Sequence, residues 1–396
     1  MTRVYGDSRF KGGYTPSELA RQRSAIARIR VKPTAEPFPK QQLTSCRVAL
    51  PNHSVHAMPD GTRVCACYFL NGILAKPSPP INPARNPPRM SDWKALYPFE
   101  SRFIEIPKSE TSAEKVRMHY VEQGESTPVA GDAGQSEPQR TILCVHGNPT
   151  WSFTYRRILN ELREQARVVA VDHIGCGLSD KPQDYNYTLE QHVGNLARLI
   201  EQLDLRRITL LVHDWGGAIG LGAALKVPTR IEQFVILNTA AFPPPYVPWR
   251  IAACRLPWVG EWGVRGLNLF ARAALKMTLN RLPQLDPAVA AGLLAPYHNW
   301  DSRVAIARFV QDIPRRKSQA TWQTLANIEE GLAIFADRPV RIVWGMKDWC
   351  FRPECLTRFE QIFPQAQITR LADVGHYVME EAADEVIAEL HQTFAR

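Results

Sequence analysis

The chain has 396 residues, of which 45% are hydrophobic and 22% are charged, a composition that is ordinary for a soluble enzyme and sufficient for a sizeable core. The formal net charge is +9, but residues 1–90 hold 14 Lys and Arg against 4 Asp and Glu, a balance of 14 − 4 = +10, which leaves +9 − 10 = −1 for the rest. The basic character therefore belongs to the leading segment, and nucleic acid is not an expected partner of the remaining chain.

Residues 1–90 do not have the pattern of a packed domain. They contain 12 of the 31 prolines, a basic stretch from Arg21 to Lys32 with helical spacing, and a Pro-rich linker from Lys76 to Arg89. This composition predicts a basic, Pro-rich, disordered extension, in which the apolar stretch Val64 to Leu74 is a docking segment or a short strand. As an alternative, Met90 would serve well as a natural start, and the preceding residues would then come from an over-extended gene boundary.

Cysteine usage and hydropathy indicate a reducing, cytoplasmic location. Cys144 and Cys176 lie near predicted strand ends, where buried, reduced thiols are expected. The Cys65-Ala66-Cys67 pair has no second pair to complete a metal site. No apolar run approaches the ~20 residues that cross a bilayer, and the N-terminus has no signal-peptide core. We therefore expect neither a metal site nor a transmembrane segment.

From Phe103 the pattern predicts an α/β domain. Phe103–Ile106 and Val116–Val121 indicate an antiparallel pair, and a polar loop, Gly124–Gln139, follows them. Short apolar strands then alternate with amphipathic helices, which implies right-handed crossovers and a parallel, doubly wound sheet. The predicted strands are Thr141–Val145, Val168–Val171, Ile208–Val212 and Phe234–Leu237, and the predicted helices are Phe153–Leu162, Leu189–Leu203 and Ala218–Leu225.

The alternation stops after Asn238 and resumes about a hundred residues later. Residues 240–335 show helical spacing without a strand-like run, as in Val264–Leu275 and Arg303–Val310. We predict that 240–335 forms a helical cap over the carboxyl edge of a core made of residues 91–239 and 336–396, because ligands bind at that edge in such sheets. The resumed elements are the strands Val340–Trp344 and Ile368–Leu371 and a closing helix, Glu380–Phe394.

One stretch has the geometry of a nucleophile elbow. The apolar strand Ile208–Val212 runs into His213-Asp214-Trp215 and two glycines, and a helix follows. A tight strand-to-helix turn exposes one side chain at the carboxyl edge and needs glycine for close backbone approach. Here that side chain is Asp214, where esterases carry Ser. The alternative interpretation is that Asp214 is a helix N-cap.

An Asp nucleophile needs a base and a group that orients the base. His376 follows the last predicted strand in a Gly-containing turn, from which an imidazole reaches over the sheet edge. Asp348 follows Val340–Trp344 and is the preferred orienting acid, because Asn238, after the preceding strand, cannot hold a negative charge. The order Asp214, Asp348, His376 is that of α/β-hydrolases, and no G-x-S-x-G competes. Three other histidines at strand ends are expected to make structural hydrogen bonds: His146, His173 and His213.

Two uncharged donors are predicted near the elbow. Asn148, in the loop after Thr141–Val145, offers an amide NH₂, and Trp215 offers an indole N–H. Such donors suit a departing anion in a dry pocket. The alternative interpretation is a turn residue before Pro for Asn148 and core packing for Trp215. Gly175 to Asp180 departs from the dinucleotide fingerprint at its last position, so nucleotide binding is not favoured.

Four motifs together resemble the haloalkane dehalogenases over roughly Leu96 to Phe394. They are His-Gly-Asn-Pro-Thr-Trp-Ser (146–152), Asp-His-Ile-Gly-Cys-Gly-Leu-Ser-Asp-Lys-Pro (172–182), Val-His-Asp-Trp-Gly-Gly (212–217) and Gly-His-Tyr (375–377). Asn238 with Asp348 resembles the third subfamily. Residues 237–243 and 308–314 look equally like the β-lactone decarboxylases of olefin biosynthesis.

The resemblance implies an α/β-hydrolase fold with a mostly parallel eight-stranded sheet, no cofactor, and a small apolar substrate, either a haloalkane or a β-lactone. Asp214 would displace halide, or open a lactone C–O bond, to form an alkyl-enzyme ester, and Asn148 and Trp215 would hold the leaving anion. His376, steered by Asp348, would activate water for hydrolysis to an alcohol in a dehalogenase, whereas a lactone-derived intermediate would lose CO₂ to give an alkene. A homo-oligomer is compatible with the resemblance.

Two other functions remain as alternatives. An epoxide hydrolase would use the same triad with cap tyrosines, for which Tyr246 and Tyr297 are candidates. An inactive binding module on this fold would usually lack a triad residue. Apolar side chains favour an apolar pocket, for which we select Trp151, Phe242 and Trp300; the wider set of cap candidates is Trp249, Trp258, Trp262, Leu267, Leu294 and Trp300.

Overall fold

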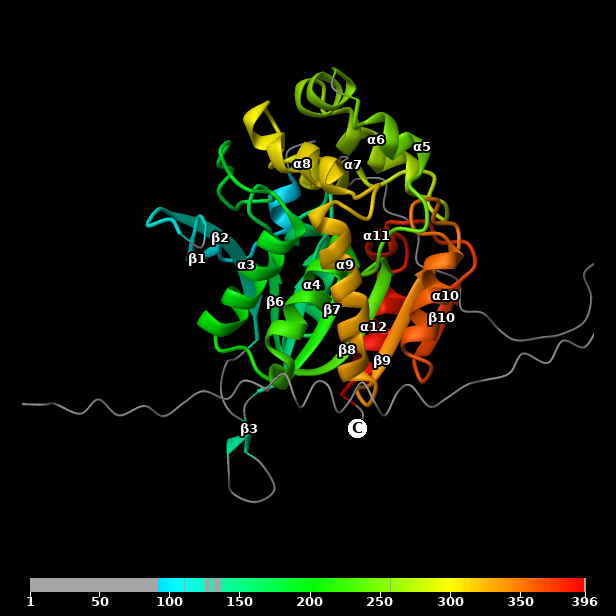
Figure 1. Ribbon diagram of the computed structural model, residues 1–396. Helices are drawn as coiled ribbons and strands as arrows, with labels where there is room; N and C mark the ends of the chain where they lie inside the picture. The colour runs from blue at the N-terminus through cyan, green and yellow to red at the C-terminus, as the bar shows by residue number, and fades with distance from the viewer. Residues whose placement is uncertain are drawn as a thin grey trace, which may run out of the picture. The chain divides into compact units, whose positions relative to one another are not determined.

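The computed structural model describes residues 92–109, 111–124, 129–130, 136–137, 139–256 and 258–394, and its centre is an eight-stranded sheet (Figure 1). The strand order is β1-β2-β6-β5-β7-β8-β9-β10, with β2 antiparallel to both neighbours and the other pairs parallel. The predicted α/β-hydrolase fold and mostly parallel sheet are confirmed. The strands are β1 (Arg102–Pro107), β2 (Lys115–Gln123), β5 (Thr141–Val145), β6 (Arg167–Val171), β7 (Ile208–Asp214), β8 (Ile231–Thr239), β9 (Val340–Gly345) and β10 (Gln367–Leu371); β3 (Val129–Ala130) and β4 (Ser136–Glu137) pair separately.

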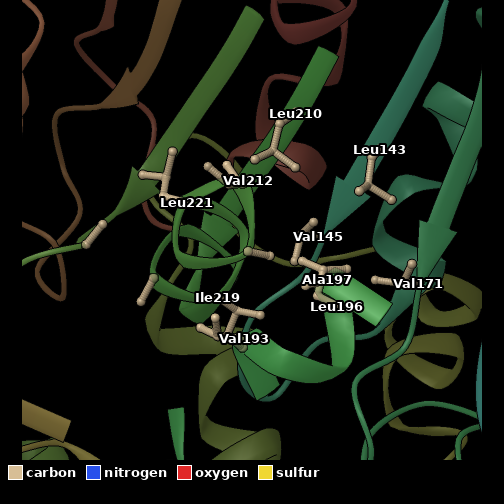
Figure 2. Packing of buried hydrophobic residues seen from close by; sticks show 14 of the residues in the cluster. Leu143, Val145, Val171, Val193, Leu196, Ala197, Leu210, Val212, Ile219 and Leu221 are labelled. Atoms are coloured by element: carbon tan, nitrogen blue, oxygen red, sulfur yellow. The ribbon is translucent and has the colours of Figure 1, made fainter. Parts of the chain in front are cut away.

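The central strands are apolar throughout because helices cover both faces of the sheet. Alternate residues of a strand point to opposite faces, and in β5 Leu143 and Val145 join one core cluster while Ile142 and Cys144 join the other. Figure 2 shows the first cluster, in which β5, β6 and β7 side chains meet α3 and α4 side chains such as Val193 and Ile219. The second cluster packs the other face against α2 and α12.

The predicted core helices are present, the first divided into η2 and α2 and the last into α11 and α12, whereas α10 was not predicted. The core helices are α2 (Arg156–Glu161), α3 (Leu189–Gln202), α4 (Trp215–Lys226), α10 (Pro353–Ile362), α11 (Val378–Glu381) and α12 (Ala383–Gln392), with short 3₁₀ turns η1 (Asp92–Leu96), η2 (Ser152–Tyr155) and η3 (Pro228–Arg230). Thr188 caps α3 by accepting a hydrogen bond from the Gln191 N–H. The predicted closing helix is broken at Ala382, whose φ of −147° is not helical.

Helices fill the segment between β8 and β9, as predicted. They are α5 (Trp249–Ala253), the π-helix η4 (Val259–Gly266), α6 (Leu269–Met277), α7 (Pro287–Leu294), η5 (Asp301–Arg303), α8 (Val304–Asp312), α9 (Ala320–Gly331) and η6 (Leu332–Phe335). The helical spacing of Val264–Leu275 is distributed over two helices, because Asn268 adopts a left-handed conformation with a φ of 54° and separates η4 from α6.

The inserted segment divides into two parts. The helices α5 to α8 lie at one end of the sheet, whereas α9 runs alongside α4 (Figure 1). Leu325 and Ile328 of α9 are buried in the core cluster with residues of α3 and α4. The predicted cap boundary at residue 335 is therefore too far along the chain, because α9 belongs to the helical layer of the core.

Several sequence features lie outside the described residues. These are the predicted N-terminal extension 1–90, with its apolar stretch and the Cys65–Cys67 pair. Cys144 and Cys176 are free and buried, as predicted. Within the described part of the chain, none of the helices combines the length and the apolar character that a membrane span requires.

Two glycines provide a matched test of the packing around α4. A Cβ on Gly216 would lie 2.1 Å from the Val145 carbonyl oxygen, whereas a Cβ on Gly194, inside α3, would have only Arg198 Nη1 at 3.8 Å. We expect Gly216→Ala to lower the free energy of unfolding by about 1–3 kcal/mol, because backbone must move. Gly194→Ala should raise it by about 1 kcal/mol through helix propensity. Urea unfolding measures both, and an equal effect of the two substitutions would contradict the close helix–strand contact.

Candidate active site

Asp214 occupies a strained turn between β7 and α4. Its φ of +53° and ψ of −130° lie in a region that residues with a Cβ rarely adopt, and such strain clusters at functional turns. Close packing enforces the turn, since a Cβ on Gly147 would lie 2.0 Å from Asp214 Oδ1. Asp214 stands at the N-cap position of α4, but its side chain makes no capping hydrogen bond. The helix-cap alternative is therefore wrong.

The carboxylate of Asp214 is held by a backbone donor and faces a histidine. The Asn148 backbone N–H donates to Oδ1 over 2.6 Å, and Oδ2 lies 3.6 Å from His376 Nε2. Burial raises the pKa of Asp214 above its usual range, although the charge of His376 and the N–H groups of Asn148 and Trp215 oppose that rise. One oxygen is thus fixed, and the other is directed toward the imidazole.

Asp348 orients His376 from the loop after β9. Its Oδ2 lies 2.8 Å from His376 Nδ1, and its Oδ1 accepts a hydrogen bond from the Cys350 N–H over 2.6 Å. Burial alone would lower the pKa of His376, but the charge and hydrogen bond of Asp348 and the charge of Asp214 together raise it. The three predicted triad residues are therefore brought together, in the order Asp214, His376, Asp348.

Asn238 has a structural role that sequence reasoning did not identify. Its Oδ1 accepts the Gly345 N–H over 2.7 Å, and its Nδ2 donates to the Gly345 carbonyl over 3.0 Å. These bonds join the end of β8 to the end of β9, from which the Asp348 loop departs. Asn238 makes no hydrogen bond to His376 among the described contacts, so its side chain positions the acid loop.

The His376 turn is tied to the inserted segment and to a buried carboxylate. The His376 N–H donates to the Thr278 carbonyl at the end of α6 over 2.8 Å. Glu381 accepts the Gly375 N–H at one oxygen over 2.6 Å and the Asn280 N–H at the other over 2.7 Å. Sequence reasoning missed Glu381, and its only signal was an acidic residue on the buried face of a short helix directly after Gly-His-Tyr.

The other strand-end histidines make structural hydrogen bonds, as predicted. His146 Nε2 accepts the His173 N–H over 3.1 Å, and His173 Nε2 lies 2.9 Å from the His146 carbonyl oxygen. His213 Nε2 lies 2.8 Å from the carbonyl oxygen of His376, beneath the triad. Burial lowers the pKa of His213 well below its usual range. Because a carbonyl oxygen only accepts, His213 Nε2–H donates this bond.

The two predicted anion donors lie together beside Asp214. One amide hydrogen of Asn148 is donated to the Ile306 carbonyl over 3.2 Å, which leaves the second, and Asn148 Oδ1 is buried without a described partner. The Trp215 indole packs on Phe309 with ring centroids 5.3 Å apart, and among the described residues its N–H has no acceptor. Both side chains line the same cavity as Asp214 and His376.

This cavity has a volume of about 420 Å³, and its lining is mostly apolar. Phe242 lines it, as predicted. Trp151 and Trp300 do not, so these two predictions are wrong. Trp151 is fully buried and donates its indole N–H to the Gly292 carbonyl over 3.0 Å, and Trp300 packs against Trp262 outside the cavity. Trp151 thus joins the loop after β5 to α7, whereas the Trp300 contact lies within the inserted segment.

The two tyrosines proposed for epoxide chemistry are engaged elsewhere. Tyr246 lines the cavity, but its hydroxyl donates to the Cys350 carbonyl over 2.9 Å and accepts the Arg352 N–H over 2.6 Å. Tyr297 does not line the cavity, and its hydroxyl donates to the Thr150 carbonyl over 3.1 Å. Both hydroxyls are engaged by backbone groups, which disfavours the epoxide hydrolase alternative.

Comparison with known proteins gives the same fold and relatives that carry two different activities. Residues 140–383 match the alpha/beta hydrolase fold family. The chain is 38% identical over 301 residues, which are 74% of this chain and 88% of the relative, to cis-3-alkyl-4-alkyloxetan-2-one decarboxylase of Shewanella oneidensis. It is 28% identical over 302 residues, 76% of this chain and 96% of the relative, to haloalkane dehalogenase 2 of Mycobacterium tuberculosis.

The solved structures that resemble the chain include a dehalogenase. Haloalkane dehalogenase DatA from Agrobacterium tumefaciens C58 superposes with a TM-score of 0.61 and 26% identity, covering 76% of this chain and 98% of that chain. Among the described residues of this chain, no group of three or more His, Cys, Asp and Glu could hold a metal ion.

The raised pKa of His376 is measurable by NMR titration of its imidazole. We expect a midpoint above ~6.5 in the native chain and a lower midpoint in Asp348→Asn, which removes the adjacent charge. Because the folded state favours the imidazolium, its contribution to stability is present at low pH and is lost as pH rises through the raised pKa. Asp373→Asn, at an exposed carboxylate paired with Arg281, is the control. An unchanged titration midpoint of His376 in Asp348→Asn would contradict the interaction of Asp348 with the imidazole.

Proposed function

Because this chain belongs to the α/β-hydrolase fold family, and is related to both β-lactone decarboxylases and haloalkane dehalogenases, we propose that it decarboxylates β-lactones with two alkyl substituents. The observation that carries the proposal is the position of Asp214 Oδ2, directed toward His376 at the wall of a large apolar cavity. Asp214 is the nucleophile, and Asn148 and Trp215 hold the anion that leaves.

In the first step Asp214 Oδ2 attacks the ring carbon that carries the lactone oxygen. A new C–O ester bond forms with inversion, the ring C–O bond breaks, and its electron pair remains on the released substrate carboxylate. Asn148 and Trp215 offer two uncharged N–H donors to this carboxylate at an apolar wall, where such donors are more effective than in water. The Asn148 backbone N–H, on Oδ1, keeps the attacking carboxylate in place.

In the second step the carboxylate leaves the adjacent carbon as CO₂. Its C–C bonding pair forms the alkene, and the ester C–O bond breaks to return Asp214 as a carboxylate. Inversion followed by anti elimination converts a cis lactone into a cis alkene, and no water is consumed. His376, as an imidazolium beside Asp214, stabilises the carboxylate that departs.

Haloalkane dehalogenation is the second candidate function. Asp214 would displace halide at a saturated carbon, and His376, oriented by Asp348, would deprotonate the water that hydrolyses the ester. The separation of 3.6 Å between His376 Nε2 and Asp214 Oδ2 is the observation that favours it, because it places a base beside the ester.

Two observations favour β-lactone decarboxylation over haloalkane dehalogenation. The relative with the decarboxylase activity shares 38% identity with this chain, against 28% for the dehalogenase over a similar length. The cavity of about 420 Å³ falls in the range of ~300–1,000 Å³ that holds drug-sized ligands, which is more than a short haloalkane fills. A long, doubly alkylated lactone uses this volume.

A single preparation of the full chain should form a cis alkene from a long-chain cis-β-lactone much faster than it releases bromide from 1,2-dibromoethane. Halide release should also rise with pH through the raised pKa of His376, because hydrolysis needs the neutral imidazole. Alkene release should fall over the same pH range, because the imidazolium assists the departure of the Asp214 carboxylate. Asp214→Asn should lower both rates roughly 10⁴-fold or more, because it removes the nucleophile.

Asp312→Asn is the matched control for that substitution. Asp312 accepts hydrogen bonds from the Leu189 N–H and the Thr321 hydroxyl and does not line the cavity. Gas chromatography of the alkene and ion chromatography of bromide measure the two products. A faster bromide release than alkene release would favour the second candidate, and full activity of Asp214→Asn would contradict both.

A further inference from the structure

The inserted segment carries most of the large apolar side chains that the described residues leave exposed. Trp258 is 78% exposed, Trp249 is 73% exposed and Leu267 is 65% exposed. Seven such residues lie between positions 249 and 277, and we call them the apolar rim: Trp249, Leu256, Trp258, Trp262, Leu267, Leu269 and Met277. Exposed apolar groups gathered in this way mark an interaction surface.

The apolar rim is continuous with the cavity of the active site. Trp249, Leu269 and Met277 are exposed to solvent and also line the cavity, so they form its mouth. They belong to α5 and α6, which lie at the end of the molecule beyond the sheet (Figure 1). The mouth is therefore largely apolar, with the Arg250 guanidinium beside Trp249 at its edge.

The part of the inserted segment that carries the apolar rim is strongly basic. Residues 249–281 contain six Lys and Arg and one Glu, a balance of 6 − 1 = +5. Arg250, Arg272 and Lys276 are exposed, and none of them forms an ion pair with a described carboxylate. On α6 the spacing of Leu269, Arg272 and Lys276 places these cations beside the apolar rim on one helical face.

From this juxtaposition we propose that the apolar rim docks on a lipid bilayer that carries anionic headgroups, and that the cavity mouth opens into it. Segments that bind a membrane surface typically carry Trp and Leu beside Arg and Lys without ion pairs, and their Trp side chains lie at the membrane–water interface. A protein partner of matching shape is disfavoured because it would have to supply carboxylates for three dispersed cations, whereas an anionic bilayer neutralises all of them wherever they lie. The surface goes beyond the proposed function and does not depend on which substrate Asp214 attacks.

Vesicle flotation of the full chain tests this surface. We expect binding to vesicles of equal parts phosphatidylcholine and phosphatidylglycerol, and weak binding to phosphatidylcholine alone. The variant Trp258→Ser/Leu267→Ser should bind the anionic vesicles about tenfold or more weakly, because it removes two groups that insert. Neither residue lines the cavity, and both are more than 60% exposed, so the fold should be retained, which thermal unfolding checks.

The matched control is Phe103→Ser/Ile334→Ser, which removes two exposed apolar side chains, 42% and 56% exposed, from outside the apolar rim. It should bind vesicles as the native chain does. Residues 1–90, with a balance of 14 − 4 = +10, are a second basic part of the chain and are unchanged in both variants. Vesicle binding that survives Trp258→Ser/Leu267→Ser would therefore not depend on the apolar rim and would overturn the proposal. Absence of vesicle binding by the native chain would also overturn the proposal. If Trp258→Ser/Leu267→Ser then formed a smaller oligomer than the native chain in sedimentation velocity, the apolar rim would be assigned to contact with a second copy of this chain.

Discussion

The site depends on keeping an ionisable carboxyl group in a buried, strained turn. Asp214 is almost fully buried, and its backbone has a positive φ that only the close approach of Gly147 and Gly216 to neighbouring chain allows. Burial alone would favour the neutral acid, which is not a nucleophile. The Asn148 N–H and the charge of His376 oppose this effect and favour the carboxylate at the edge of an apolar cavity.

The remaining triad residues are positioned by loops that depend on each other. Asn238 holds the start of the acid loop, and Glu381 and the Thr278 carbonyl hold the histidine turn. The inserted segment therefore contributes to the geometry of His376 as well as to the walls of the cavity. α6 thus lines the cavity mouth and, at its end, holds the turn that carries the imidazole.

Much of this arrangement could be predicted from the sequence because it depends on local patterns. Apolar runs of β5, β7 and β8 identified the buried strands, and the positions of Asp214, Asp348 and His376 after strands brought them to one edge. The errors concern contacts between segments far apart in the chain. No local pattern shows that Trp151 turns into the core toward Gly292, or that α9 packs on α4. The left-handed Asn268 that divides a continuous helical pattern is likewise determined by its surroundings.

The proposed function requires that Asp214 forms a covalent ester with a saturated carbon of the substrate. Incubation of His376→Ala with a long-chain 1-bromoalkane, followed by peptide mass spectrometry, tests it most directly, because removal of the base prevents hydrolysis of the ester. We predict that the peptide containing Asp214 gains the mass of one alkyl group with loss of one hydrogen, and that Asp214→Asn/His376→Ala gains nothing. Alkylation of another residue in place of Asp214, or its persistence in the double variant, would contradict the account.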